Sequence, residues 1–290
     1  MFEGFHHRKI RTAEIELDVR HGGSGPPLLL LHGYPQTHAM WRKVAPILAA
    51  HFTVVAPDLR GYGDSAKPPG LPDHSNYSKR AMAQDQVELM DALGFERFCV
   101  AGHDRGGRVA HRMALDHPGR VAKLAVLDIA PTRTMYARTT RAFAKAYFHW
   151  FFLIQPAPFP EQLIGADPEA YLRKLMGGRF AGLAPFEPDG WPEYVRAFGD
   201  PATIHATCED YRAAESIDLA HDDADFGRRR IECPLLVLWG RHGVIEQLFD
   251  ALADWKEYAA DVRGRALACG HYLPEERAEE TAAELARFFG

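Results

Sequence analysis

Cysteine pairs, long apolar runs and internal repeats are all missing from this sequence. Its four cysteines are scattered, without a C-x-x-C pair or the spacing of metal ligands, at Cys99, Cys208, Cys233 and Cys269. No apolar stretch is long enough to span a membrane, and the N-terminus has no apolar core followed by a cleavage site. We therefore expect reduced thiols in the cytoplasm, no metal ion and no membrane partner.

An excess of positive charge is missing as well. The chain has 34 Lys and Arg against 39 Asp and Glu, which gives a net charge of -5. This balance argues against nucleic acid as a partner. With 290 residues, 47% of them hydrophobic, the chain is long enough for one large core or for a core with an inserted second domain.

A serine nucleophile is absent from the stretch around which the chain is organised. An apolar strand from Cys99 leads through Gly102-His103-Asp104-Arg105-Gly106 into a helix without proline that extends to His117. Flanking glycines permit a strained turn that exposes one side chain at the end of a strand. Here that side chain is Asp104, and an aspartate can attack an electrophilic carbon and form an ester. The sequence thus predicts a carboxylate nucleophile and excludes a serine esterase.

Two arginines accompany this nucleophile. Arg105 follows Asp104 directly, and Arg108 lies one helical turn further along. Two guanidinium groups should keep Asp104 ionised and can hold a planar anion by paired hydrogen bonds. Arginines near a helix start are otherwise usually solvated surface charges. Their position beside the nucleophile indicates a substrate that carries a carboxylate.

The acid and the base of a triad are predicted from strand ends. The strand 235–240 often carries the acid in this arrangement, but the residues after it are Arg241-His242-Gly243-Val244. The aspartate at the end of strand 124–127, Asp128, is therefore the better candidate, with Glu246 in reserve. His271 follows the last predicted strand, near 265–269, and completes the order nucleophile, acid, base.

The other histidines and the charged loop residues are expected to have structural rather than catalytic roles. His242 is the second candidate for the base, whereas His6, His7, His21 and His38 are interpreted as surface residues. The charged residues of the loop from Asp58 to Ser65 are expected to brace the loop rather than to catalyse. The exposed backbone N–H groups of Tyr34 and Arg105 are expected to form the oxyanion hole.

Strand and helix patterns alternate along most of the chain. Apolar strand patterns at 15–19, 28–31, 52–56, 98–101, 124–131, 235–240 and 265–269 alternate with helical patterns such as 82–93 and 278–289. This alternation predicts an α/β fold with a mostly parallel sheet covered by helices on both faces. Residues 134–226 have no strand pattern and are expected to form a helical lid inserted between two core segments, 1–133 and 227–290.

The predicted lid contains three side chains with a hydrogen-bond donor in apolar surroundings: His149, Trp150 and Tyr211. Each of them, taken alone, is as easily explained as a core residue as it is as a ligand-binding residue. Their spacing by itself leaves both interpretations open.

Several motifs together resemble the α/β-hydrolase superfamily and, within it, the haloacetate dehalogenases, including the fluoroacetate dehalogenases. The resemblance extends over essentially the whole chain, and it is carried by 102–108, 111–118, Leu127-Asp128-Ile129, His149-Trp150 and Asp210-Tyr211-Arg212. In that family an arginine follows the nucleophile, where haloalkane dehalogenases and epoxide hydrolases usually have tryptophan. Two departures stand out: Tyr34 is commonly phenylalanine in relatives, and the loop 241–243 is unusually basic.

The resemblance implies a complete assignment of the site. Arg105 and Arg108 would bind the substrate carboxylate, and His149, Trp150 and Tyr211 would donate hydrogen bonds to the leaving halide. Asp104 would form the ester, and His271, oriented by Asp128, would activate the water that hydrolyses it. No metal or organic cofactor is needed, and a homodimer is expected.

Two other functions stay open at this point. An epoxide hydrolase would use the same triad with Tyr211 on the epoxide oxygen, but the two arginines have no role on a neutral substrate. A binding protein without activity, which would usually have a broken triad, is a different class.

Overall fold

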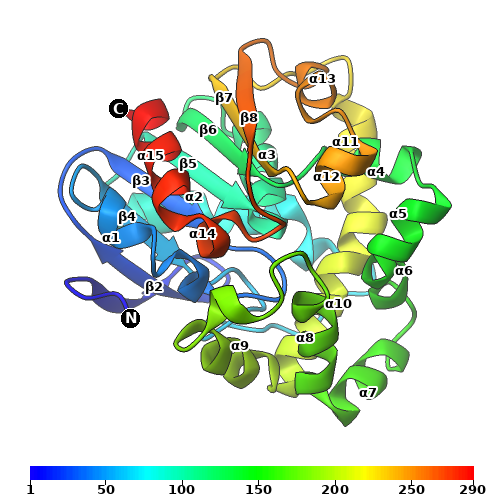
Figure 1. Ribbon diagram of the computed structural model, residues 1–290. Coiled ribbons are helices and arrows are strands. Elements are labelled where there is room, and N and C mark those ends of the chain that lie inside the picture. The colour runs from blue at the N-terminus through cyan, green and yellow to red at the C-terminus, as the bar shows by residue number, and fades with distance from the viewer.

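The computed structural model describes residues 1–290, and its centre is one eight-stranded sheet (Figure 1). The strand order is β1-β2-β4-β3-β5-β6-β7-β8. The strands are β1 (His6–Arg11), β2 (Glu16–Gly22), β3 (Pro27–Leu31), β4 (Thr53–Pro57), β5 (Phe98–His103), β6 (Val121–Leu127), β7 (Leu235–Gly240) and β8 (Val262–Leu267). Only β2 runs against its neighbours, and the pairs from β4 to β8 are parallel.

The central strands are continuous apolar runs because helices cover both of their faces. Leu28, Leu29, Leu30 and Leu31 are fully buried along β3, which is the pattern of an interior parallel strand. The predicted α/β fold with a mostly parallel sheet is confirmed. The sequence pattern does not predict the edge strand β1, since its residues HHRKIR are mostly exposed and have no apolar alternation.

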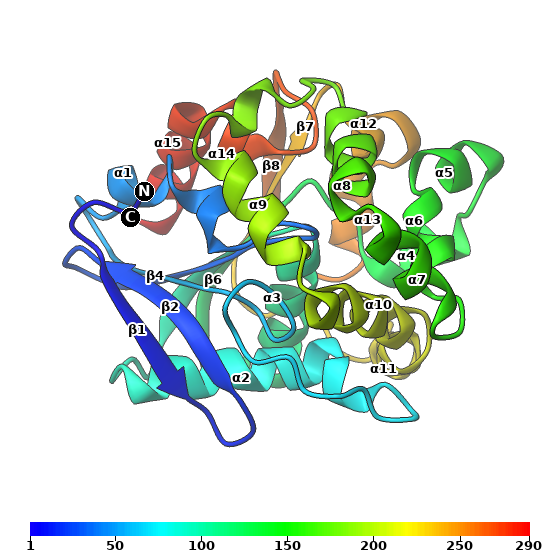
Figure 2. The ribbon, with the colours of Figure 1, turned by 90° about the horizontal axis from the view of Figure 1, so that it is seen from below.

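Two groups of helices cover the sheet (Figure 2). In that view α2 and α3 lie together on one side of the strands, and α1 and α15 lie on the other. The helices of the core are α1 (Ala45–Leu48), α2 (Lys79–Ala92), α3 (Arg105–Asp116), α12 (Val244–Leu248), α13 (Ala251–Lys256), α14 (Leu273–Glu276) and α15 (Ala278–Phe289), with short 3-10 turns η1 (His38–Trp41) and η2 (Ser75–Tyr77).

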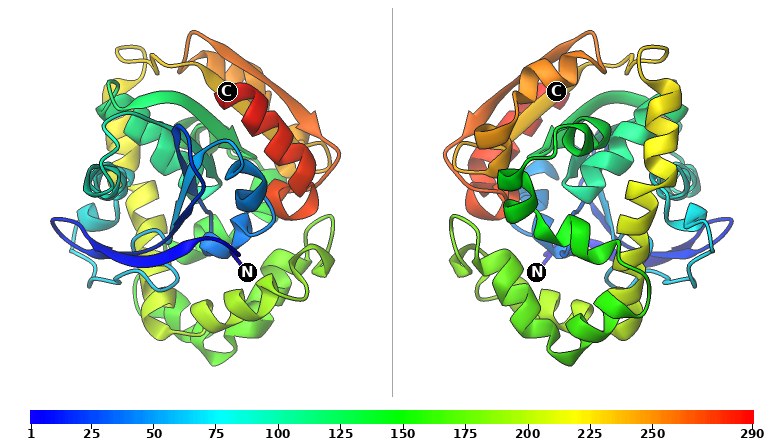
Figure 3. Two further views of the ribbon diagram at one scale, coloured as in Figure 1. Left: turned by 90° about the vertical axis from the view of Figure 1, so that its left-hand side faces the viewer. Right: turned by 90° about the vertical axis from the view of Figure 1, so that its right-hand side faces the viewer.

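A second group of helices is inserted between β6 and β7. It comprises α4 (Thr132–Ala137), α5 (Arg141–Ala146), α6 (Phe148–Leu153), α7 (Phe159–Ala166), α8 (Pro168–Gly177), η3 (Ala184–Phe186), α9 (Gly190–Phe198), α10 (Pro201–Glu215) and α11 (Ile217–Asp225). Helices of this segment make up the lower part of both views in Figure 3. No helix of the chain is long and apolar enough to cross a membrane. We refer to residues 134–226 as the lid.

The strand order brings the carboxyl ends of β3, β5, β6 and β8 to the same edge of the sheet. The strand β5, which leads into Asp104, lies between β3 and β6. The loop after β3 contains Tyr34, and Asp128 follows β6 directly. The last two strands, β7 and β8, lie beyond β6, and the loop after β8 contains His271. Because parallel strands end at the same edge, residues far apart in sequence meet there.

Candidate active site

Asp104 occupies a strained turn between β5 and α3. Its backbone has φ 47° and ψ -114°, a conformation that non-glycine residues rarely adopt. The turn fits only because its flanks lack side chains. A Cβ atom on Gly102 would lie 2.4 Å from the carbonyl oxygen of Gly106, and one on Gly106 would lie 2.3 Å from that of His32. The glycine pattern around Asp104 is therefore a packing requirement.

His271 and Asp128 form a hydrogen-bonded pair at the same edge. His271 donates from Nδ1 to Oδ2 of Asp128 across 2.6 Å, and the Gly240 amide donates to Oδ1 of Asp128 across 2.8 Å. His103 donates from Nε2 to the His271 carbonyl across 2.8 Å and so fixes the backbone of this loop. Asp128 thus holds the His271 ring with Nε2 free to accept a proton.

The carboxylate of Asp104 is held in its charged form. Burial by itself raises the pKa of Asp104, but the nearby charges of His271, Arg108, His103 and Arg105 outweigh burial and lower the pKa to about 2. The Tyr34 amide donates to Oδ1 of Asp104 across 3.1 Å. An ionised, buried carboxylate beside an imidazole is the arrangement that nucleophilic catalysis by aspartate requires.

Glu246 and His242, the second candidates for the acid and the base, form no hydrogen bond or ion pair with the triad residues. Glu246 is exposed and accepts a hydrogen bond from the indole of Trp239. His242 is exposed and stacks on Phe180, with ring centroids 4.3 Å apart, rather than pairing with a carboxylate.

Both arginines beside Asp104 are buried, and each keeps one donor nitrogen without a partner. Arg105 donates from Nε and Nη2 to the carboxylate of Asp210, at 3.0 and 2.6 Å, while its Nη1 has no partner. Arg108 donates from Nη1 to the Ala130 carbonyl and to Thr132, while its Nε has no partner. A buried donor without an acceptor is costly, so these two groups point to a ligand with acceptor oxygens.

The sequence does not single out Asp210, which the structure places against Arg105. Its carboxylate also accepts from Tyr62 at 2.6 Å and from Lys79. Burial raises its pKa, but Arg105 and Lys79 outweigh burial and hold that pKa well below its usual range. Asp210 fixes the plane of the Arg105 guanidinium so that Nη1 is the free donor. The signal was its place in the Asp210-Tyr211-Arg212 motif, but its partner lies 105 residues away.

The three lid donors lie close together, and the charge of Asp104 acts on two of them, His149 and Tyr211. His149 and Trp150 come from α6 and Tyr211 from α10, and the Tyr211 ring centroid is 5.8 Å from that of His149 and 6.4 Å from that of Trp150. Nδ1 of His149, Nε1 of Trp150 and the Tyr211 hydroxyl are buried without partners. Burial lowers the pKa of His149 and raises that of Tyr211, so both are uncharged near neutral pH. Together they offer neutral hydrogen-bond donors to a small ligand.

Tyr136 on α4 extends this group. Its ring centroid lies 5.0 Å from that of Trp150, and its hydroxyl is also buried without a partner. Nothing in the sequence distinguishes this tyrosine from the other aromatics of the lid.

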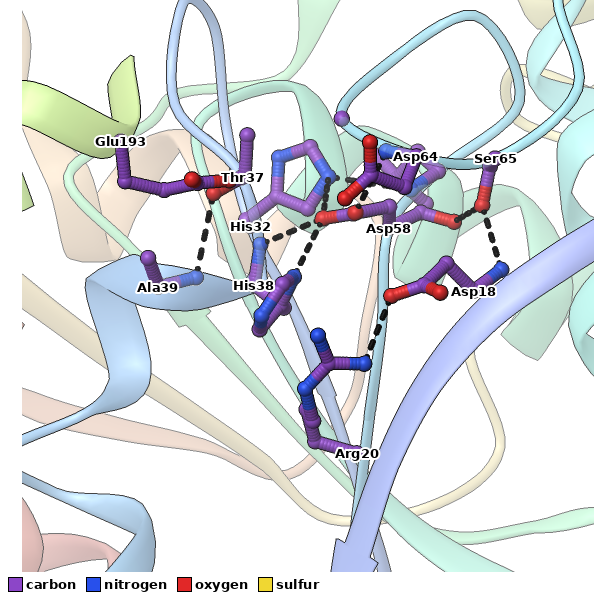
Figure 4. Close-up of polar contacts among 12 residues, drawn as sticks. Asp18, Arg20, His32, Thr37, His38, Ala39, Asp58, Asp64, Ser65 and Glu193 are labelled. Atoms are coloured by element: carbon purple, nitrogen blue, oxygen red, sulfur yellow. Dashed lines mark hydrogen bonds and ion pairs between the residues drawn. The ribbon is translucent and has the colours of Figure 1, made fainter. Parts of the chain in front are cut away.

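The loop after β4 is braced by a buried carboxylate (Figure 4). Asp58 accepts from the backbone amide of His38 at 2.7 Å, from its Nδ1 at 2.8 Å, and from the Asp64 amide at 2.9 Å. His38 is only 5% exposed, so its interpretation as a surface residue is wrong: its ring is needed as a partner for Asp58. Asp18 lies nearby, but its two oxygens already accept from His7 and Arg20. This cluster ties the segment that carries Tyr34 to the neighbouring loop.

Replacement of Asp58 by asparagine is expected to destabilise the fold by about 3 kcal/mol, the scale for losing one partner of a buried charged pair. The pKa of Asp58 is lowered, because the His38 interactions outweigh burial, so its contribution is present above about pH 4 and lost in acid. The pKa of His38 is raised by Asp58 against the effect of burial, so its contribution is present below about pH 6.5 and lost as the pH rises.

Urea unfolding of wild type and Asp58→Asn between about pH 4 and 9 checks this expectation. The difference in unfolding free energy should be largest in the window from about pH 4 to 6.5 and smaller above it. A difference that is independent of pH would mean that the pair contributes no charge interaction.

A model of the family described as "alpha/beta hydrolase fold" matches residues 26–278. The chain belongs to the α/β hydrolase fold family. This α/β hydrolase is 50% identical to the fluoroacetate dehalogenase of Burkholderia sp. The match covers 99% of this chain and 95% of the relative. It is 35% identical to the soluble epoxide hydrolase of Corynebacterium sp. (strain C12), over 92% of this chain and 91% of the relative.

Among solved structures, this hydrolase is similar to a Nostoc sp PCC 7120 protein whose description is "a putative alpha/beta hydrolase". The TM-score is 0.97 and the identity 58%, with 99% of both chains covered. The family membership predicted from the motifs is thus confirmed, both for the superfamily and for the dehalogenase family within it.

Proposed function

We propose that this chain is a haloacetate dehalogenase, which hydrolyses fluoroacetate or chloroacetate to glycolate and halide. One observation carries the proposal: around Asp104 the buried donors without partners include one nitrogen on each of two arginines and three neutral lid groups. A haloacetate has a carboxylate at one end and a halogen that becomes an anion at the other. The 50% identity to a protein named fluoroacetate dehalogenase supports the same activity.

In the first step, Nη1 of Arg105 and Nε of Arg108 bind the substrate carboxylate. An oxygen of Asp104 attacks the α-carbon in line with the carbon–halogen bond. The new carbon–oxygen bond forms as the halide leaves with the bonding electrons. His149, Trp150 and Tyr211 donate to the halide as its charge develops, which lowers the energy of the transition state more than that of the bound substrate.

In the second step, water hydrolyses the ester on Asp104. His271 takes a proton from the water at Nε2, and Asp128 stabilises the imidazolium that results. The water attacks the carbonyl carbon of Asp104, and the Tyr34 amide, together with the amide of Arg105 at the start of α3, stabilises the oxyanion. As the intermediate collapses, the glycolate oxygen leaves with the proton held by His271, the remaining proton of the water is released, and Asp104 is a carboxylate again. No metal or organic cofactor takes part.

The lid and the assembly form part of the same proposal. Residues 134–226 act as a lid domain over the core segments 1–133 and 227–290, which is supported by the helices between β6 and β7 and by the donors they supply. A cytoplasmic location is supported by four cysteines that are all free thiols. A homodimer is supported by the family resemblance and by Phe159 and Leu163, which are exposed one turn apart on α7.

An epoxide hydrolase is the second candidate, because it would use the same Asp104, Asp128 and His271. The free hydroxyl of Tyr211 and the 35% identity to a protein named soluble epoxide hydrolase favour it. The free N–H groups of Arg105 and Arg108 count against it, since a neutral epoxide would leave both unpaired.

The test is product release from purified protein given fluoroacetate, chloroacetate and styrene oxide in parallel, in buffer without halide. Halide and glycolate are measured for the acids and diol for the epoxide. We expect halide and glycolate in equal amounts from the acids and no diol. Halide from chloroacetate alone would keep the mechanism but show that the lid donors do not stabilise fluoride. Diol formation without halide would overturn the proposal in favour of the epoxide hydrolases.

A further inference from the structure

A cavity of about 400 Å³ lies between the lid and the loops that follow β7 and β8. Residues of α5, α6 and α8 line one side, and Gly243, Gly270 and His271 line the other. The wall extends from exposed residues, such as Phe180 with 60% of its surface accessible, to the buried catalytic base. Because the triad and the lid donors are buried, a substrate needs an approach of this kind to reach Asp104.

The wall of this cavity carries positive charge and no acid. It contains Lys145, Lys174 and Arg179, together with the His242 imidazole, and no aspartate or glutamate. None of these four side chains forms an ion pair. By contrast Arg173, the neighbour of Lys174 on α8, pairs with Glu169 at 2.6 Å.

Two carboxylates close to the wall, Glu276 and Asp128, accept hydrogen bonds from other groups. Glu276 accepts from the backbone amides of Gly270 and Tyr272, at 2.6 and 3.0 Å. Asp128 accepts from His271. Burial lowers the pKa of Arg179, but Tyr147, Tyr272, Asp128 and Asp104 outweigh burial and raise it. No carboxylate forms an ion pair with any of the three cations, so an anion from solution can still be their direct partner.

Arg179 is the innermost of these cations. Its side chain is half-buried, and the guanidinium carbon lies 5.0 Å from the centroid of the Tyr147 ring. Burial and then the charge of Arg179 lower the pKa of His149, so Arg179 is close to one of the lid donors. It thus stands between the exposed lysines and the site of reaction.

We propose that Arg179, with Lys145 and Lys174, forms an outer anion site that attracts the carboxylate of a haloacid into the cavity and selects anionic over neutral substrates. This inference rests on the proposed dehalogenase function. The three residues are specificity-determining: they act before the carboxylate reaches Arg105 and Arg108. An electrostatic attraction of this kind acts over distance and weakens with salt.

The test compares kcat and KM for chloroacetate in wild type, Arg179→Gln, Arg179→Lys and the triple variant that also changes Lys145 and Lys174 to glutamine. Ionic strength is varied from about 0.01 M to about 1 M, over which the screening length falls from about 30 Å to about 3 Å. We expect Arg179→Gln to raise KM about fivefold and the triple variant about twentyfold at low salt, with a much smaller change in kcat. Arg179→Lys should restore most of the loss.

Arg173→Gln is the matched control, because it removes a charge from the same helix outside the cavity. Its KM and its salt dependence should equal those of wild type. An unchanged KM in the triple variant, or a rise in KM that persists at about 1 M salt, would overturn the inference and leave the dehalogenase function standing.

A second measurement separates the two proposals. Dissociation constants for chloroacetate and for neutral chloroacetamide are measured on Asp104→Asn protein, with and without Arg179→Gln. We expect weaker binding of the acid alone when Arg179 is changed. If the wild type releases no halide at all, the proposed function is wrong, and this comparison still decides the outer anion site. Equal losses for acid and amide would count against that site.

Discussion

Asp104→Asn is expected to lose halide release almost completely, with kcat reduced by at least about 10⁴-fold, the scale for removing a catalytic nucleophile. An amide oxygen is a far weaker nucleophile than a carboxylate, and at pKa about 2 the wild-type group is fully ionised at neutral pH. The local fold should be kept, since the asparagine oxygen can still accept from the Tyr34 amide. Halide release with fluoroacetate and chloroacetate measures the effect.

The control for Asp104→Asn is Asp91→Asn, which changes an exposed carboxylate paired with Arg120 and should keep full activity. Mass spectrometry of the peptide that contains position 104 must show that asparagine has not reverted to aspartate by deamidation. Dehalogenation by protein that still carries asparagine would disprove the ester mechanism.

His271→Asn is expected to stop the reaction after the ester on Asp104 has formed. The first step needs only Asp104 and the donors, so one halide per active site should be released in a burst. Hydrolysis of the ester needs a base, and its loss slows turnover by roughly 10²- to 10⁴-fold. The protein should therefore accumulate the ester on Asp104, which intact-mass measurement detects as an added carboxymethyl group.

His51→Asn serves as the control, because His51 is exposed on the turn that leads into β4, at the edge of the sheet opposite to the carboxyl ends of the parallel strands. It should show steady turnover and no added mass. If His271→Asn gave neither a burst nor an adduct, His271 would be needed for the first step, and its role as the base for water would be wrong.

The strand pattern was sufficient to predict the fold because each buried strand is a short apolar run between turn signals. The same logic led to Asp128: with no aspartate after Leu235–Gly240, the acid had to come from the end of the neighbouring strand. The structure brings Asp128, His271 and Asp104 together at one edge of the sheet. The edge strand β1 could not be predicted, because an exposed, charged strand has no apolar periodicity.

Pairings between distant residues were beyond the sequence. Nothing in the neighbourhood of His38 indicates that it pairs with Asp58, so the sequence predicts a surface histidine where the structure has a buried one. The contact of Arg105 with Asp210 depends on how α10 crosses the site. Spacing along the sequence cannot show that a polar atom lacks a partner. The sequence therefore predicts His149, Trp150 and Tyr211 as donors only through the family resemblance.

The hydrogen bond from the Tyr34 amide makes the two oxygens of Asp104 unequal. In the proposed mechanism Oδ1 is held by that donor, so we expect Oδ2 to attack and Oδ1 to become the ester carbonyl, already placed for the oxyanion. Glycolate then departs with Oδ2, and an oxygen from water takes its place on the protein. In water enriched in a heavy oxygen isotope, the first glycolate from each molecule would be unlabelled. Every later one would carry the label that the previous turnover left behind.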